Sequence, residues 1–277
     1  MTLLFDFHSP NSHIKGSNLT IGILKLIETP FFTEVGEIAR FTGRFFKEIT
    51  KPRQEFEEFI NQCFWIGFKT FTLVSITAFI MGLVLTIQSR PTLVEFGAAS
   101  LLPSMVSVSL VREISPVITA LICAGKIGSG IGAELGSMRV TEQIDAMEVS
   151  GTNPFKYLVV TRVMASTLMV PVLSILAIAI SIYGGFLGVN LKGSVSWSLY
   201  WFQAFDALSY GDFIPSLIKT FFFGFAIGIV GCYKGYNSKK GTEGVGRSAT
   251  TAVIVASLLV FILDLIAVQV TDLLGLT

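Results

Sequence analysis

The chain has 277 residues, of which 52% are hydrophobic and 14% are charged, and its formal net charge is +1. Soluble domains carry about 25% charged residues and could not bury this much apolar surface, which includes 24 Phe. The low net charge and the lack of Lys or Arg runs exclude a basic nucleic-acid-binding surface. The composition therefore predicts an integral membrane protein.

The cysteines and histidines exclude several kinds of catalytic centre. Cys63, Cys123 and Cys232 are widely spaced in or beside apolar stretches, which fits neither a disulfide framework nor a zinc site. His8 and His13 lie in the polar N-terminal tail, outside the apolar body, where no triad or metal centre can use them. We therefore expect no catalytic residue, no metal site and no resident cofactor in this chain.

Residues 29–63 predict an amphipathic helix followed by an elbow, after a tail of residues 1–28. Thr29 suits the N-cap and Pro30 the first helical position. Apolar residues then recur at helical spacing between charged ones, as in a helix lying flat on a membrane surface. A soluble helix packed on a partner is the alternative. The apolar positions are Phe31, Val35, Ile38, Phe41, Phe45 and Ile49.

Five later stretches are long and apolar enough to cross a bilayer, which takes about 20 residues. They are residues 64–87, 105–133, 157–189, 214–233 and 248–274. The predicted fold class is therefore an all-α integral membrane protein, with five transmembrane helices preceded by an N-terminal amphipathic interfacial helix.

The distribution of Lys and Arg predicts the orientation. These residues gather before the first span and in the second and fourth connections, whereas the other connections hold only Arg90 and Lys192. We expect a cytoplasmic N-terminus and a C-terminus outside. The third connection also contains an aromatic cluster typical of a helix in the outer interface. Its members are Trp197, Tyr200, Trp201, Phe202, Phe205 and Tyr210.

Glycines in the second span predict close helix packing. They are Gly125, Gly128, Gly132 and Gly136, the last three at intervals of four. A phosphate-binding loop is excluded because Ile127 follows Lys126 where Ser or Thr is needed. Ser129 lacks a membrane-embedded His that could act as the base of an intramembrane protease.

Residues 134–153 predict a short amphipathic helix on the cytoplasmic side. Glu142, Asp145 and Glu148 form its acidic edge. It could be a solvated loop helix, or it could be the element that a soluble motor protein grips.

Four charged residues lie within the predicted spans, where a charge is costly. They are Arg112, Glu113, Lys219 and Asp264. At about 1.5 Å rise per residue, all four fall in the outer half of the bilayer. Because their charges cancel, we predict a paired polar cluster with Lys219 and Asp264 as an interhelical pair. Its role could be functional or could be neutralisation alone, with Arg112 and Lys219 reaching toward outer headgroups.

The motifs from about Gln54 to the C-terminus resemble those of the MlaE/YrbE family. The matching residues are Arg112-Glu113-Ile-Ser-Pro116-Val, Ala124-Gly125-Lys126-Ile-Gly128-Ser, Ala133-Glu134-Leu-Gly136-Ser-Met138-Arg139-Val-Thr141-Glu142-Gln143-Ile-Asp145-Ala146-Met147-Glu148, and Gly244-Val-Gly246-Arg247 with Asp264. One departure is Lys126, where the family more often has Arg; Lys keeps the charge but weakens bidentate pairing.

Members of this family are permease subunits of ABC transporters associated with MCE proteins. The resemblance implies that residues 64–277 form a permease domain that dimerises in the inner membrane. It further implies cytoplasmic ATPase subunits that hold ATP and Mg, a hexameric MCE protein on the outer side, and phospholipid as cargo, in the maintenance of outer-membrane lipid asymmetry. The family's coupling helix maps onto Thr141–Glu148. The residues expected to couple to the ATPase are Glu134, Arg139, Thr141, Glu142, Gln143, Asp145 and Glu148.

Our leading hypothesis is a lipid permease without covalent chemistry of its own. We expect an outward-facing cavity lined by the first, second and fifth spans of two copies. Acyl chains would contact Phe79, Leu83, Val84 and Ile87, and headgroups would meet Arg112, Glu113, Lys219 and Asp264. The alternatives are a permease for another hydrophobic lipid such as a sterol, and a proton-coupled secondary transporter that uses Glu113 or Asp264. A membrane lipid enzyme would need clustered ligands or a nucleophile with its base.

Overall fold

The computed structural model describes residues 30–51, 55–191, 193, 195–239 and 241–275, with side chains from residue 33 onward. The chain divides into two compact units, Met1–Arg44 and Phe45–Thr277. The predicted tail, the Thr29 cap, the Phe31 side chain and Lys192 lie outside the described residues.

Every regular element in the described residues is a helix, which confirms the predicted all-α class. The elements are α2 (Pro30–Ile49), α3 (Phe56–Glu95), η1 (Ala99–Leu101), α4 (Leu102–Ser109), η2 (Leu110–Ile114), α5 (Ser115–Cys123), η3 (Ala124–Gly128), α6 (Ser129–Val140), α7 (Gln143–Val149), η4 (Phe155–Val160), α8 (Thr161–Asn190), α9 (Trp197–Asp206), α10 (Tyr210–Tyr236) and α11 (Thr242–Leu273). Of these, η1 is a 3-10 helix, and η2, η3 and η4 are π-helical turns.

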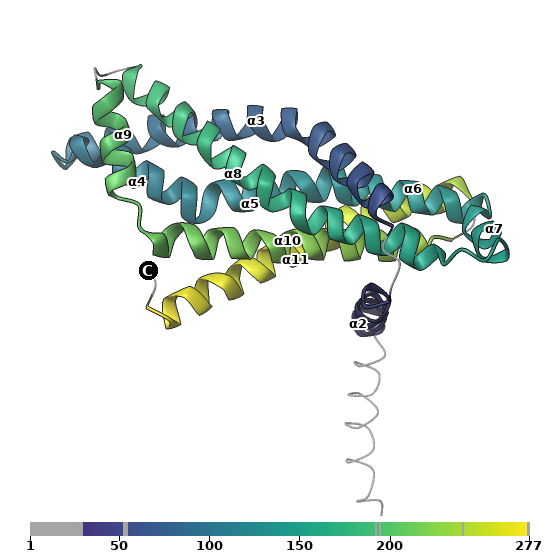
Figure 1. The fold of residues 1–277 in the computed structure, drawn as a ribbon. Helices are drawn as coiled ribbons and strands as arrows, with labels where there is room; N and C mark the ends of the chain where they lie inside the picture. The colour runs from purple at the N-terminus through teal and green to yellow at the C-terminus, as the bar shows by residue number, and fades with distance from the viewer. Residues whose placement is uncertain (1–29, 52–54, 192, 194, 240, 276–277) are drawn as a thin grey trace, which may run out of the picture. The chain divides into compact units, whose positions relative to one another are not determined.

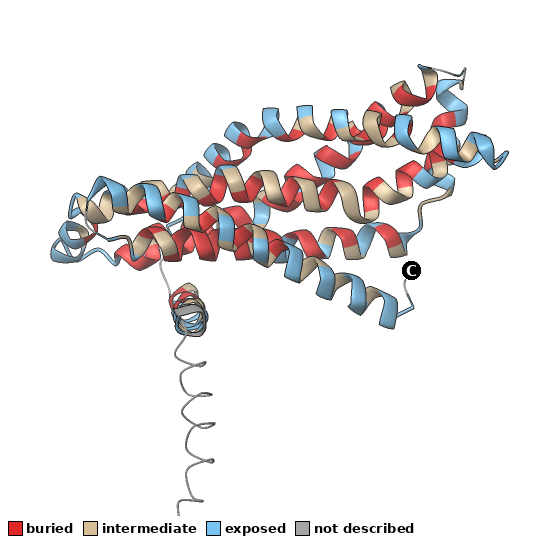
Figure 2. Ribbon diagram, turned by 180° about the vertical axis from the view of Figure 1, so that it is seen from behind, coloured by how far each residue is buried: buried red, intermediate tan, exposed pale blue. Residues whose placement is uncertain are grey.

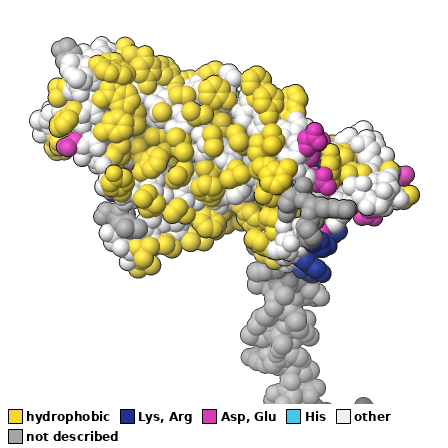
Figure 3. Space-filling model, in the orientation of Figure 1, with side chains coloured by type: hydrophobic (Ala, Val, Ile, Leu, Met, Phe, Trp, Pro, Cys, Tyr) yellow, Lys and Arg dark blue, Asp and Glu magenta, His cyan; other side chains and the backbone are white. Residues whose placement is uncertain are grey.

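Five helical segments of the described chain are long and apolar enough to cross a membrane. They are Phe56–Glu95, Ala99–Val140, Phe155–Asn190, Tyr210–Tyr236 and Thr242–Leu273. Each predicted span falls within one of these segments, except that the fifth predicted span extends one residue beyond its segment, to Leu274. The five-span prediction is therefore confirmed. Hydrophobic side chains cover most of the face of the second unit shown in Figure 3, as lipid contact requires.

One predicted span lies within a longer helix, and one predicted helix needs correction. The helix that contains the predicted span 64–87 begins at Phe56, and Glu57 and Glu58 in its first turn favour that start through the helix dipole. The predicted helix over residues 134–153 is divided, because α6 continues to Val140 and α7 begins only at Gln143. Glu142 separates them with a left-handed backbone, φ 59°.

Helix α8 packs closely against α3 and α10, through glycines that the sequence analysis did not single out. A Cβ atom at Gly184 would lie 3.2 Å from the Phe79 carbonyl carbon, and one at Gly224 would lie 2.9 Å from Thr167 Cα. Small residues let helix backbones approach in this way, which is how helices associate in lipid. Buried positions accordingly follow the inner faces of these helices (Figure 2).

Opposite ends of the second unit carry α9 and α7 (Figure 1). The helix predicted from the aromatic cluster is present as α9, and Trp201 stacks on Phe205 within it. Tyr200 differs from the expectation of a headgroup contact: it is fully buried and donates a hydrogen bond to the Ile182 carbonyl at 3.1 Å. Burial raises the pKa of the Tyr200 hydroxyl, so this donor keeps its proton.

Candidate functional site

Lys219 joins three membrane segments through charged hydrogen bonds. Its ammonium donates to Glu113 Oε2 at 2.7 Å and to Asp264 Oδ1 at 2.9 Å. Lys219 belongs to α10, Glu113 to η2 and Asp264 to α11. Lys219 is only 5% exposed, and a buried cation needs such partners. The predicted pairing of Lys219 with Asp264 is therefore confirmed.

The π-helical turn η2 places Arg112 and Glu113. Pro116 has no amide hydrogen, so the Arg112 carbonyl lacks its usual donor four residues later. The Ser115 amide donates to the Leu110 carbonyl rather than to the Val111 carbonyl, which it would reach in an α-helix. The Ser216 hydroxyl also donates to the Val111 carbonyl at 2.7 Å, which fixes α10 against this turn. Turns of this kind are frequent at functional sites.

Arg112 pairs with Asp212, a residue that the sequence analysis missed. Asp212 is 4% exposed and also accepts hydrogen bonds from the Ser209 amide at 2.7 Å and the Ser209 hydroxyl at 2.9 Å. Ser209 and Asp212 form the capping box of α10. The spacing of Ser209 and Asp212 at the start of an apolar run was the available sequence signal.

With Asp212 included, the cluster contains two cations and three carboxylates, in the pairs Arg112–Asp212, Lys219–Glu113 and Lys219–Asp264. The expectation of cancelling charges therefore holds only for the four predicted residues. The Glu113 side chain is 45% exposed, the most accessible carboxylate of the cluster. The cluster thus offers both signs of charge to a ligand.

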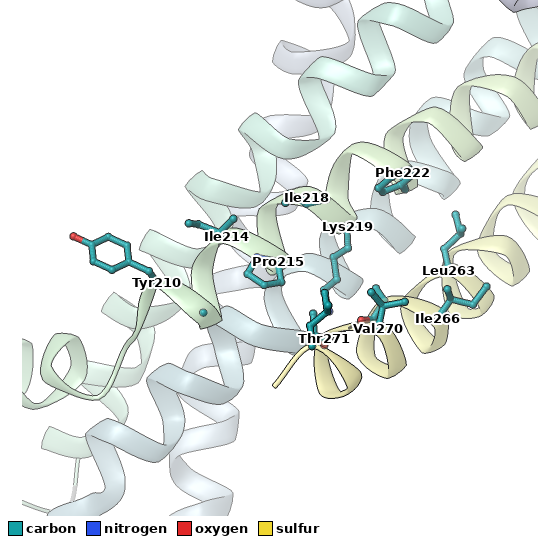
Figure 4. Close-up of a pocket in the computed structure, with 13 residues that line it drawn as sticks. Tyr210, Ile214, Pro215, Ile218, Lys219, Phe222, Leu263, Ile266, Val270 and Thr271 are labelled. Carbon is teal, nitrogen blue, oxygen red and sulfur yellow. Dashed lines mark hydrogen bonds between the residues drawn. The ribbon is translucent and has the colours of Figure 1, made fainter. Parts of the chain in front are cut away.

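Two cavities adjoin the cluster. One, of about 560 Å³, is almost entirely apolar and lies between α10 and α11. Lys219 extends from α10 toward α11 at its wall, beside Ile218 and Pro215 (Figure 4). The other, of about 240 Å³, contains Arg112, Glu113, Asp212 and Lys219. Lys219 lines both, so an apolar chain and a charged group could be bound side by side.

The residues predicted to contact acyl chains lie elsewhere. Phe79, Leu83, Val84 and Ile87 are on α3, and none of them lines either cavity. The cavity beside Lys219 is formed by the fourth and fifth spans, because α11 diverges from α10 toward its C-terminal end (Figure 1). A further cavity formed between two copies stays a prediction.

Helix α7 presents an exposed surface at the end of the second unit opposite α9. Ile144 is fully buried and anchors the helix, whereas Val149 is 90% exposed. Arg139 donates to Asp145 at 2.5 Å across the α6–α7 turn. The structure places Thr141, Glu142, Gln143, Asp145 and Glu148 together here, all of them exposed.

Glu134, also predicted to couple to the ATPase, lies in α6 instead. Its carboxylate accepts from Arg162 of α8 at 2.7 Å. The Glu134 side chain is still 53% exposed, so its role in coupling stays a prediction.

The predicted packing glycines behave differently from one another. A Cβ atom at Gly132 would lie 3.3 Å from Ala249 Cα, so α6 and α11 are in close contact there. Gly136 faces Ser238, and Gly128 makes ordinary contact with Ile227. No described atom lies within 4 Å of a Cβ built on Gly125, so close packing at that residue stays a prediction.

The sequence was compared with known protein families and with curated proteins. Residues 59–270 match the family described as Permease MlaE. The chain belongs to the MlaE permease family. The match covers all the charged residues of the cluster and the whole of α7.

Relatives of the MlaE permease family match most of the chain. A "Probable ABC transporter permease protein" of Rickettsia typhi is 38% identical over 232 residues, 84% of this chain and 90% of the relative. A protein of the same description from Synechocystis is 36% identical over 221 residues, 80% and 84% of the two chains. The "Intermembrane phospholipid transport system permease protein MlaE" of Haemophilus influenzae is 36% identical over 222 residues, 79% and 85%. The chain is therefore an ABC transporter permease of the MlaE type.

Proposed function

We propose that this chain is the permease subunit of an ATP-driven transporter that moves phospholipid between the inner membrane and an MCE protein. The observation that carries the proposal is the position of Lys219, which lines both the apolar cavity and the charged one. Ligand pockets typically enclose about 300–1,000 Å³, and the apolar cavity has about 560 Å³. The phospholipid named for the Haemophilus influenzae relative has the same division into apolar chains and charged headgroup.

The charged cluster would hold the headgroup. Arg112 and Lys219 can donate to a phosphate, and Glu113 can accept from a headgroup amine. An acyl chain would enter between α10 and α11. In a homodimer the α3 residues Phe79, Leu83, Val84 and Ile87 would extend this apolar path.

The exposed surface of α7 would meet the ATPase, which supplies ATP and Mg from a separate subunit. The acidic residues Asp145 and Glu148 suit a basic partner surface, and Val149 suits an apolar contact at its centre. ATP-driven closure of two ATPase subunits would move α7 and α6 in each copy. Because α6 packs on α11 at Gly132, that movement would reach the cavity beside Lys219.

The permease would lie in the inner membrane, with α7 and the N-terminus cytoplasmic and α9 and the C-terminus periplasmic. The excess of Lys and Arg in the connections at the α7 end supports this orientation. The MCE protein would then approach from the α9 end.

The test is transfer of a fluorescent phospholipid from vesicles that contain the permease with its co-purified partners. We expect transfer that needs hydrolysable ATP, together with recovery of an ATPase, an MCE protein and bound phospholipid from a mild-detergent pull-down. Transfer that depends on a proton gradient and does not depend on ATP would favour the proton-coupled alternative. Preferential recovery of a sterol would change the cargo.

A further inference from the structure

Lys69 of α3 and Lys126 of η3 are lysines of the membrane segments for which the described residues supply no acidic partner. Among the described residues, no carboxylate lies within ion-pair distance of Lys69 or Lys126. The Lys69 ammonium lies 4.3 Å from the centre of the Trp65 ring, its one described contact. Three other cations of the membrane segments, Arg112, Arg162 and Lys219, each have a carboxylate partner. Both lysine side chains are exposed, so their charges are available to an anion from outside the chain.

Both lysines line one cavity. It has about 620 Å³ and lies between α3, η3, α6 and the start of α11. Gln62 and Ser137 add polar groups, and Glu134 on its wall is already paired with Arg162. The cavity shares no lining residue with the charged cavity beside Lys219.

A buried hydroxyl at this cavity also lacks a partner. Thr70 lines it and is 1% exposed, and its Oγ1 has no hydrogen-bond partner among the described residues. Threonines in helices normally donate to a carbonyl one turn back, as Thr86 does to Gly82. A ligand in the cavity would satisfy a donor that the chain itself leaves unused.

The level of the cavity in the membrane distinguishes a lipid from a soluble anion. Residues 70–89 carry no charge and have about the length that a bilayer core requires. Lys69 and Arg90 border this stretch, so Lys69 lies at one hydrocarbon boundary, where lipid phosphates lie. The apolar side chains of Ile66, Ile127 and Ile131 line the same cavity and would meet acyl chains.

We propose that this cavity binds the phosphate of an acidic phospholipid headgroup through Lys69 and Lys126. In the proposed orientation the lipid belongs to the cytoplasmic leaflet. The site is separate from the cluster around Lys219, so this proposal goes beyond the proposed function. Failure of the lipid site would leave the proposed transport function standing.

Trp65 provides the probe, because it lines the cavity and the other two tryptophans, Trp197 and Trp201, are both in α9. The full chain with Trp197→Phe and Trp201→Phe is reconstituted in mixed vesicles of phosphatidylglycerol and phosphatidylcholine. One lipid at a time carries brominated acyl chains, and the ratio of Trp65 quenching gives the relative affinity. We expect phosphatidylglycerol to be preferred, by about fivefold for each lysine.

Matched variants decide the assignment. Lys69→Gln with Lys126→Gln should bring the preference close to one. Lys69→Arg with Lys126→Arg should keep it, and so should Lys239→Gln, an exposed lysine between α10 and α11.

Equal quenching by both lipids in the parent, or a preference that survives the double Gln change, would overturn the proposal. Loss of the preference on adding millimolar inorganic phosphate would assign the site to a free anion instead. Absence of quenching by either lipid would show that a second copy covers the cavity, and would also overturn it.

Discussion

The Lys219 ammonium lies 2.9 Å from Asp264 Oδ1 and so joins α10 to α11, the two helices that enclose the apolar cavity. The same ammonium binds Glu113 of η2 at 2.7 Å. One buried cation therefore holds together the fourth, second and fifth membrane segments beside the proposed cargo site. This arrangement makes the structural and functional roles of the charges separable by mutation.

Lys219→Met should destabilise the permease strongly, because it leaves Glu113 and Asp264 without their cation. Removing one partner of a buried ion pair costs about 3–5 kcal/mol. Adding Glu113→Gln and Asp264→Asn should restore most of the thermal stability in detergent, yet transfer of phospholipid should stay low. A triple variant that transports at the parent rate would assign the cluster to stability alone.

Glu142→Lys combined with Asp145→Lys should weaken ATPase binding by about tenfold or more, because interface charges of the wrong sign repel the partner. Co-purification of the ATPase and ATP-dependent transfer should fall together, whereas bound phospholipid should persist. Glu95→Lys with Asp206→Lys is the matched control, since both residues are exposed but lie outside α6 and α7. Equal ATPase recovery from the two variants would contradict the coupling assignment of α7.

Gly184→Ala should lower the stability by about 1–3 kcal/mol through overpacking. The new Cβ would lie 3.2 Å from the Phe79 carbonyl carbon and 3.3 Å from the Leu83 amide nitrogen, both of which are backbone atoms of α3. Gly246→Ala, with no described atom within 4 Å, should leave the unfolding temperature unchanged or raise it slightly. Identical unfolding temperatures for the parent and Gly184→Ala would show that α3 and α8 can separate without loss.

Asp212→Ala should destabilise more than Ser209→Ala. Loss of a capping side chain costs about 1 kcal/mol, and Asp212→Ala also removes the carboxylate that pairs with Arg112. Comparing the unfolding temperatures of the two variants in the Arg112→Gln background tests this explanation. The difference between them should shrink there, because Arg112 no longer needs a partner; an unchanged difference would be evidence against the pair.

The prediction of the Lys219–Asp264 pair succeeded because helical rise alone gives the depth of each residue in the membrane. Asp212 was missed because it lies at the beginning of α10, where a carboxylate suits a helix cap as well as an ion pair. The pairing of Glu134 with Arg162 was missed because nothing in the segment around Glu134 identifies a residue 28 positions later as its partner.

The sequence by itself determined the membrane class, the five spans, the family and one interhelical ion pair, Lys219 with Asp264. These properties follow from local hydropathy, from helical rise and from motifs that are contiguous in the chain. Only the tertiary structure decided the other contacts: Arg112 with Asp212, Arg162 with Glu134, and the shared cavity of Lys69 and Lys126. The reason is that side-chain contact between helices depends on the rotation of each helix about its axis and on the glycines that set interhelical distance. Neither is fixed by depth or by hydropathy.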